Sequence, residues 1–360
     1  MRYKAAGPMT KKTTDTLLEL LAIDSDNRAE KSEIIRYAID RLRGFGMKVK
    51  KIGDVGTPAI IATNGIGGIA FSGHLDTVPI GDGWNRKQGE IVNGRVYGRG
   101  AADMKGAVAS MTHAAETLID EDVPCSIMLT TDEEERMLGA LALSRLDEVK
   151  KAAAIIIPEP TALNVAVKEK GVFRFRLKTY GLAAHSSQSW LGENAITKMH
   201  SMLGRLTDLA QTPKGPTEDL TMCFATITGG TKNNVVPDRC ETEIDVRFPA
   251  PQTPGDIDEL LRKRLGSGGY DIEIIYGLDA FQSNPRSWIV SEIRSLLGTE
   301  VISVPYATEA PRYVKVNPRI FICGPGEPRM AHVVDEYVEI EKMELTYRML
   351  VHLARRVAQG

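Results

Sequence analysis

Apolar residues recur at helical spacing early in the chain, and strand-like runs follow. Between residues 14 and 45 they return every three or four positions, which predicts amphipathic helices. Short aliphatic runs predict strands at residues 59–63, 68–72, 126–131 and 152–157. Further helices are expected near residues 104–118, 288–297 and 341–358. Helices alternating with strands are typical of an α/β fold with a largely parallel sheet.

A block in the middle of the chain has a different pattern. Residues 172–180 alternate apolar and charged side chains, as a half-exposed strand does. A helix, two strands, a second helix and a last strand are expected next, at residues 194–209, 222–228, 240–248, 254–265 and 271–275. This β-α-β-β-α-β order is the split-βαβ arrangement of a small α+β domain. We therefore predict a catalytic domain of residues 1–170 and 278–360, interrupted by an inserted domain of residues 171–277.

Composition excludes several classes of protein. With 360 residues the chain is long enough for two domains, and its 26% charged residues and net charge of −2 are ordinary for a globular protein. No basic excess points to nucleic acid, and no apolar stretch is long enough to span a membrane. The four cysteines lie far apart and lack the clustering of a disulfide framework, so reduced thiols are expected. The N-terminal residues lack the apolar core of a secretion signal. A cytoplasmic location is expected.

The first candidate site is the segment SGHLDTVP, residues 72–79. His74 and Asp76 stand two apart at the end of an expected strand, so their side chains can project to the same side. A carboxylate beside a metal-binding histidine fixes the tautomer of its ring. Taken alone, this spacing is more often explained by surface or capping residues.

Asp103 lies in a second segment, GRGAADMKG, just before an expected helix. Its simplest explanation is a helix N-cap. The surrounding glycines instead favour a tightly bent backbone that holds one carboxylate in place. An aspartate held in this way can bridge two cations through its two oxygens.

Three more segments place carboxylates or a histidine after strands or in loops. Glu133 and Glu134 belong to TDEEER, which follows a buried strand; a solvated face is the alternative explanation. At the carboxyl edge of a sheet, such residues would lie where open α/β folds keep their sites. Glu159 ends the strand IIIPEP, and His332 lies in a loop rich in glycine and proline.

Together these residues form a donor set for two divalent ions. Asp103, Glu134 and Glu159 offset most of the positive charge of two such ions, and His74 and His332 add nitrogen donors. Metal ions of this kind lower the pKa of bound water. The remaining carboxylate, Glu133, is then available as a general base.

In this order, the motifs resemble peptidase family M20, the aminoacylase and carboxypeptidase family of co-catalytic zinc enzymes, over nearly the whole chain. The resemblance implies a zinc-exopeptidase-like catalytic domain that binds two Zn²⁺ or Co²⁺ ions. It implies His74 and Glu159 on one ion, Glu134 and His332 on the other, and Asp103 as the bridge. Asp76 is then expected to orient His74, and Glu133 to be the base.

The inserted domain also matches the family, in AAHSS at residues 183–187 and NNVVP at residues 233–237. The resemblance implies a lid that pairs two subunits into a homodimer. His185 is expected to polarise the scissile carbonyl in the neighbouring subunit, and Asn234 to donate to the substrate. Arg247 is expected to bind a substrate carboxylate. An ordinary loop histidine and a surface arginine are the alternative interpretations of His185 and Arg247.

The expected reaction is hydrolysis of the amide bond of an N-acyl amino acid. Within the family resemblance, YATEAP at residues 306–311 implies acetylornithine as the first candidate substrate, whereas NNVVP is more similar to the pattern of desuccinylases that act on succinyl-diaminopimelate and of dipeptidases. A homologue that binds metal without catalysis is the alternative from another class. Glu309 is predicted either to bind a substrate amine or to support a metal ligand.

Overall fold

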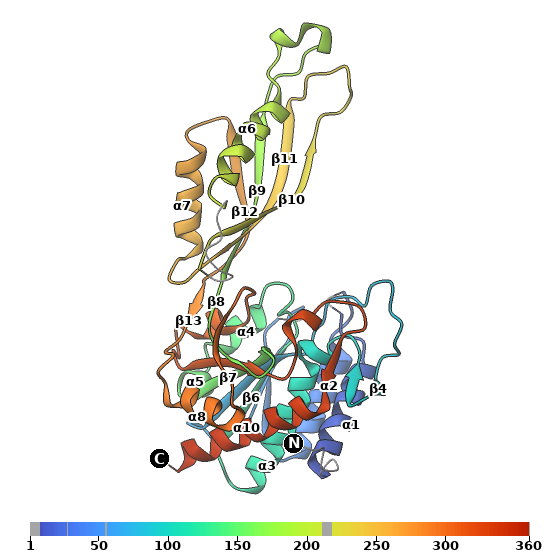
Figure 1. The fold of residues 1–360 in the computed structure, drawn as a ribbon, viewed down its shortest axis with the longest axis vertical. Coiled ribbons are helices and arrows are strands. Elements are labelled where there is room, and N and C mark those ends of the chain that lie inside the picture. Colours follow the sequence, from blue (N-terminus) through green and yellow to red (C-terminus); the bar gives the residue numbers. More distant parts are fainter. Residues whose placement is uncertain (1–7, 27, 55, 211–217, 360) are drawn as a thin grey trace. The chain divides into compact units, whose positions relative to one another are not determined.

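The chain forms two compact units (Figure 1). Each unit has its own hydrophobic core. The computed structural model describes residues 8–26, 28–54, 56–210 and 218–359. The first unit comprises Met1–Val167, Ser283–Ile302 and Thr308–Gly360, and the second comprises Lys168–Gln282 and Ser303–Ala307. In the part of the chain that is described, no helix has the length and apolar character needed to cross a membrane.

The first unit is built around a mixed sheet with a parallel centre. The strand order is β1 (Lys48–Ile52), β2 (Ala59–Thr63), β6 (Cys125–Thr130), β3 (Ile69–His74), β7 (Ala154–Pro160), β15 (Ile320–Gly324) and β8 (Val165–Glu169), with β14 (Val301–Val304) also pairing with β8. Strands β6, β3, β7 and β15 run parallel, and the flanking pairs are antiparallel. Every residue of β3, β6 and β7 is buried, as expected for parallel strands covered on both faces. The α/β fold predicted from the sequence is confirmed.

Helices cover both faces of this sheet. On one face, Phe71, Ile156 and Phe321 share a core with α1 (Pro8–Ala22), α2 (Ser32–Gly44), α3 (Gly106–Asp120), α8 (Trp288–Leu297) and α10 (Ile340–Ala358). On the other face, α4 (Leu138–Leu143) packs against β2 and β6, and α9 (Ala310–Tyr313) lies beside α4. The short helix α5 (Asp147–Lys150) precedes β7, and β4 (Glu90–Val92), β5 (Arg95–Tyr97) and β16 (Tyr337–Glu339) form a small separate sheet.

The carboxyl ends of the parallel strands meet at one edge of the sheet. Strand β3 ends at His74, β6 ends just before the acidic segment of residues 131–136, and β7 ends at Pro160, one residue after Glu159. This edge is where open α/β sheets bind ligands.

The second unit is a four-stranded antiparallel sheet in the order β10 (Thr221–Gly229), β11 (Arg239–Phe248), β9 (Gly171–Tyr180) and β12 (Tyr270–Leu278). Helices α6 (Ala195–Thr207) and α7 (Pro254–Leu265) bury their apolar sides against alternate residues of β9 and β11. Asn194 caps α6, and Thr253 and Asp256 form a capping box at the start of α7. A short strand, β13 (Phe281–Gln282), pairs with residues 168–169 of β8. The chain order β9-α6-β10-β11-α7-β12 is the split-βαβ order expected from the sequence.

Candidate metal centre

His74 ends β3 with its imidazole fully buried and its two nitrogens in different surroundings. Nδ1 donates to the backbone carbonyl of Asp76 at 2.9 Å, so Nε2 is the nitrogen that faces the acidic cluster. Nε2 lies 3.0 Å from Oδ1 of Asp103 and 3.7 Å from Oε1 of Glu159. The carboxylate of Asp76 accepts the backbone N–H of Glu134 at 3.1 Å. Asp76 thereby connects His74 to the segment that carries Glu134.

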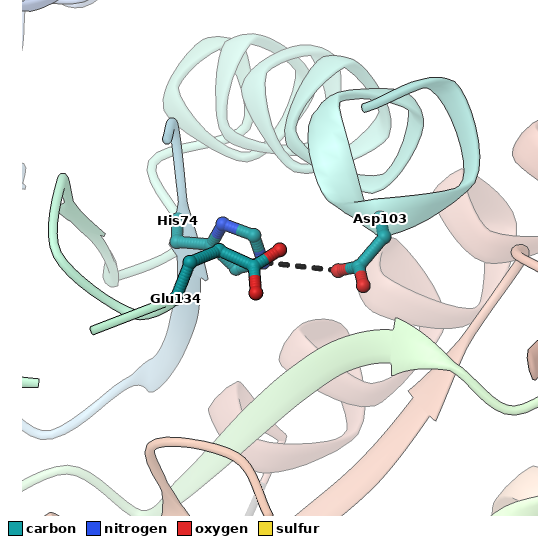
Figure 2. A group of neighbouring side chains, drawn as sticks. All are labelled: His74, Asp103 and Glu134. Atoms are coloured by element: carbon teal, nitrogen blue, oxygen red, sulfur yellow. Dashed lines mark hydrogen bonds and ion pairs between the residues drawn. The ribbon is translucent and has the colours of Figure 1, made fainter. Parts of the chain in front are cut away.

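A second histidine approaches Asp103 from another segment. Nε2 of His332 lies 2.8 Å from Oε1 of Glu134 and 3.4 Å from Oδ2 of Asp103. The two oxygens of Asp103 therefore face two different histidines. His74, Asp103 and Glu134 each offer a donor atom, and these atoms all lie within 4.8 Å of one another (Figure 2).

The cluster contains more buried carboxylates than cationic groups. Burial raises the pKa of both Glu133 and Glu159 well above the ordinary range, and the nearby charge of Asp103 adds to the effect on Glu159. Burial opposes the charged form of His74, but its hydrogen bonds to Asp103 and Asp76 outweigh burial and hold its pKa well above its ordinary value. The raised pKa values mean that Glu133, Glu159 and His74 hold protons more strongly, and these protons offset the negative charge of the cluster as bound cations would. Buried carboxylate oxygens and imidazole nitrogens are a donor set suited to divalent ions such as Zn²⁺ or Co²⁺.

His332 is more open than the rest of the cluster. Hydrogen bonds to Asp103 and Glu134 raise its pKa to about 10. Its side chain is 49% exposed, compared with 1% for His74. The His332 side of the cluster therefore faces solvent, and the His74 side lies in the interior.

Comparison with known proteins assigns this arrangement to a family. The profile of peptidase family M20/M25/M40 matches residues 70–356, which include the whole cluster. The chain belongs to this family. It is 31% identical, over 311 residues that cover 80% of each chain, to acetylornithine deacetylase from Shigella sonnei. As an M20 family member, the protein is a metal-dependent hydrolase.

Solved structures share the M20 fold across nearly the whole chain. A tripeptidase from Staphylococcus aureus has a TM-score of 0.81 at 19% identity, covering 98% of this chain and 99% of its own. A dinuclear metal-binding peptidase of the M20 family from Bacillus subtilis has a TM-score of 0.74 at 15% identity, covering 98% and 99%. At these identities the likeness concerns the fold.

Glu133 and Glu309 are both buried in the first unit, in different surroundings. Glu133 immediately precedes Glu134 and is 9% exposed. Glu309 is 0% exposed, and its carboxylate accepts from Ser72 Oγ at 2.8 Å and from Thr130 Oγ1. The hydroxyl of Tyr313 lies 3.4 Å from the same carboxylate. These contacts tie Glu309 to β3 and to the end of β6 in the interior of the first unit, and both hypotheses for its role stay predictions.

In the second unit, His185 and Asn234 are exposed neighbours. The backbone N–H of Ser186 donates to the carbonyl of Asn234 at 3.0 Å, and His185 forms an isolated bridge with Val235. Nδ1 of His185 accepts the N–H of Ser187 at 3.2 Å, so a neutral ring carries its proton on Nε2. A cavity of about 560 Å³ lies alongside, lined by residues that include Ser186 and Asn194.

Arg247 lies on β11 with its guanidinium already paired. It donates to both carboxylate oxygens of Asp245, at 2.6 and 3.2 Å, and Arg174 donates to the same carboxylate at 2.7 Å. The two arginines share one acidic partner, so these three side chains together carry one net positive charge.

The sequence interpretation missed the residues that hold the cluster together. Arg99 and Glu336 form a buried ion pair at 2.6 Å, and Asp335 binds the backbone of residues 85–86. A signal was present for Glu336, because it follows His332 by four residues in the same loop. Nothing in the sequence showed that it is buried.

Proposed function

We propose that the protein hydrolyses the amide bond of an N-acyl amino acid with two bound divalent metal ions, zinc or cobalt. The observation that carries the proposal is the position of Asp103, whose two oxygens face His74 on one side and His332 on the other. A carboxylate in this position suits a bridge between two cations.

In this proposal His74 and Glu159 hold one ion, Glu134 and His332 hold the other, and Asp103 belongs to both. The backbone carbonyl of Asp76 accepts a hydrogen bond from Nδ1 of His74, which leaves Nε2 available as the metal-binding atom. Bound metal ions of this type act as Lewis acids toward the substrate carbonyl and make water more acidic.

Glu133 is the proposed general base. It takes a proton from the attacking water and passes it to the nitrogen of the leaving amine. Its buried position supports this role, because burial raises the pKa of Glu133 and so makes its carboxylate a stronger base.

His185 is proposed to act across a homodimer, by donating from Nε2 to the scissile carbonyl in the neighbouring subunit. The tautomer set by Ser187 supports this role. Strand β10 supports the dimer, since it is the first strand in the order of its sheet and exposes Phe224 and Ile227. An apolar edge strand of this kind is a surface suited to pairing with a second copy.

Acetylornithine is the first proposed substrate, since the relative from Shigella sonnei is named acetylornithine deacetylase. Arg247 is proposed to take the α-carboxylate, and Asn234 to donate to the substrate. A succinylated amino acid or a short peptide is the alternative, and peptidases are among the structural neighbours.

A substrate panel with parallel metal analysis tests the proposal. Metal-free protein is reconstituted with Zn²⁺ or Co²⁺ and assayed with N-acetylornithine, N-succinyl-diaminopimelate, a dipeptide and a tripeptide. We expect two metal equivalents per chain and the highest kcat/KM with N-acetylornithine. A preference for another substrate would reassign the acyl group, and absence of all hydrolysis in the two-metal protein would overturn the catalytic role.

A further inference from the structure

Glu336 is a fully buried carboxylate that binds two successive backbone N–H groups, those of Ala102 and Asp103. Its Oε1 accepts the N–H of Ala102 at 2.9 Å and the N–H of Asp103 at 3.1 Å. Its Oε2 accepts from Nη1 of Arg99 at 2.6 Å. Both oxygens are therefore engaged by donors of the protein, and Glu336 is not positioned as a metal ligand.

Arg99 extends this network to a third segment. Its Nε donates to the carbonyl of Pro79 at 3.3 Å, and its Nη2 lies 3.5 Å from the carbonyl of Ile80. Both carbonyls belong to the loop that follows His74 and Asp76. The buried Arg99–Glu336 pair thus joins the segments that carry His74, Asp103 and His332.

The loop that presents His332 needs such support. His332 has a φ of +65° and Asp335 a φ of +53°, in the left-handed region that residues with a side chain rarely adopt. Asp335 binds the N–H groups of Asn85 and Arg86 at 2.8 and 3.0 Å, while Glu336 binds those of Ala102 and Asp103. Two adjacent carboxylates therefore hold this loop against two different segments.

We propose that Glu336, paired with Arg99, is a positioning residue that fixes His332 relative to Asp103 and so forms the metal position on the His332 side. This inference rests on the proposed two-metal function. His74 depends less on the pair, because it lies within the parallel ladder of β3, where it pairs with Thr130 of β6. Loss of Glu336 should therefore affect the two metal positions unequally.

Titration of the metal-free full-length protein with Co²⁺ or Zn²⁺ tests this asymmetry. Glu336→Gln keeps the shape of the side chain, but one end of its amide is a donor, so it cannot accept from both the backbone N–H groups and Arg99. We expect the affinity of one metal equivalent to fall about 10-fold or more and the other to change less than about 3-fold. The visible absorption of the affected Co²⁺ equivalent should change in step.

Two further variants separate positioning from general destabilisation. Glu339→Gln makes the same chemical change at a partly exposed ion pair with Arg95, and both metal affinities should stay as in the wild type. Arg99→Gln should weaken the same equivalent as Glu336→Gln, and the double variant should lose little more than either single one.

The outcomes distinguish the inference from the function it rests on. If the wild type fails to bind two equivalents, the proposed function is wrong. If the wild type binds two and Glu336→Gln binds both with wild-type affinity, Glu336 has no positioning role. Equal weakening of both equivalents together with a lower free energy of unfolding would show a purely structural role and would also overturn the inference.

Discussion

The candidate residues of the two units differ in how they are held. In the first unit, histidines and carboxylates from five separate segments converge with nitrogen–oxygen distances of 2.8 to 3.7 Å, and all but His332 have side chains no more than 14% exposed. In the second unit, His185 and Asn234 are exposed and Arg247 is paired with Asp245. The proposed metal ligands therefore all lie within one unit. His185 and Arg247, which are proposed to act on the carbonyl and the carboxylate of the substrate, belong to the other unit.

Electrostatics gives a reason for this difference. Buried carboxylates are costly unless cations or hydrogen bonds compensate for their charge, so the first unit needs a tight network. An exposed side chain such as that of His185 carries no such cost, and Arg247 is only partly exposed and is compensated by Asp245. The predictions below test this division, from the largest expected effect to the smallest.

The largest effect is expected at the base of the first unit. Glu133→Gln should lower kcat at least about 100-fold, because it removes the group that transfers the proton. The metal content should stay unchanged, because Glu133 is not one of the proposed metal ligands. Glu134→Gln should in addition weaken one metal position. Steady-state kinetics and metal analysis of both variants check the assignment, which is wrong if the two keep equal metal and equal activity.

Glu309 gives the first unit a pH-dependent stability. Burial raises its pKa to about 7 from an ordinary 4.5, so the folded chain keeps a proton that the unfolded chain releases between these values. The free energy of unfolding should therefore fall as pH rises from 4.5 to 7, by up to about 3 kcal/mol from this group. Glu309→Gln cannot titrate and should remove that part of the slope.

Denaturant unfolding of the metal-free wild type and of Glu309→Gln at pH 5 and 7.5 measures the difference in slope. Ser72→Ala removes a donor to the ionised carboxylate and should shift the fall to higher pH. Parallel profiles for the wild type and Glu309→Gln would show that Glu309 titrates alike in the folded and unfolded chain.

The sequence predicted the fold and the cluster better than the groups around them. His74, Glu134 and Glu159 were found because each lies at or near the end of an apolar strand, where periodicity and chemistry coincide. Strands of three residues, such as β4 and β5, are too short to show a period. The hydrogen bond from the backbone N–H of Asp103 to Glu336 joins residues 233 positions apart, and no local pattern carries that information.

One contact of the second unit had a local signal that the sequence interpretation did not use. Asp245 and Arg247 stand two apart on a strand, so their side chains project from the same face. The sequence interpretation used such alternation only for residues 172–180 and treated residues 240–248 simply as an expected strand, although charged residues alternate along β11 as well. Pairing of these two residues follows from the same alternation.

Mixed subunits test whether the two units cooperate across a dimer. Glu133→Gln and His185→Ala homodimers should each be nearly inactive. After subunit exchange, about half of the dimers are mixed and each has one intact site, so activity should recover to about a quarter of the wild type. Verified exchange without any recovery would count against a shared site.

The smallest effect is expected at Arg247. Its charge is already partly offset by Asp245, so Arg247→Met should raise KM only about 10-fold for substrates with a free α-carboxylate, equivalent to ~1.4 kcal/mol. The value of kcat should change little, and substrates with a carboxamide in place of the carboxylate should show no rise in KM. Asp245→Asn supplies the opposite change, because it releases positive charge from both Arg247 and Arg174 and should lower KM for the carboxylate substrates. If Arg247→Met raises KM equally for carboxylate and carboxamide substrates, the arginine supports the sheet of the second unit and does not bind the substrate.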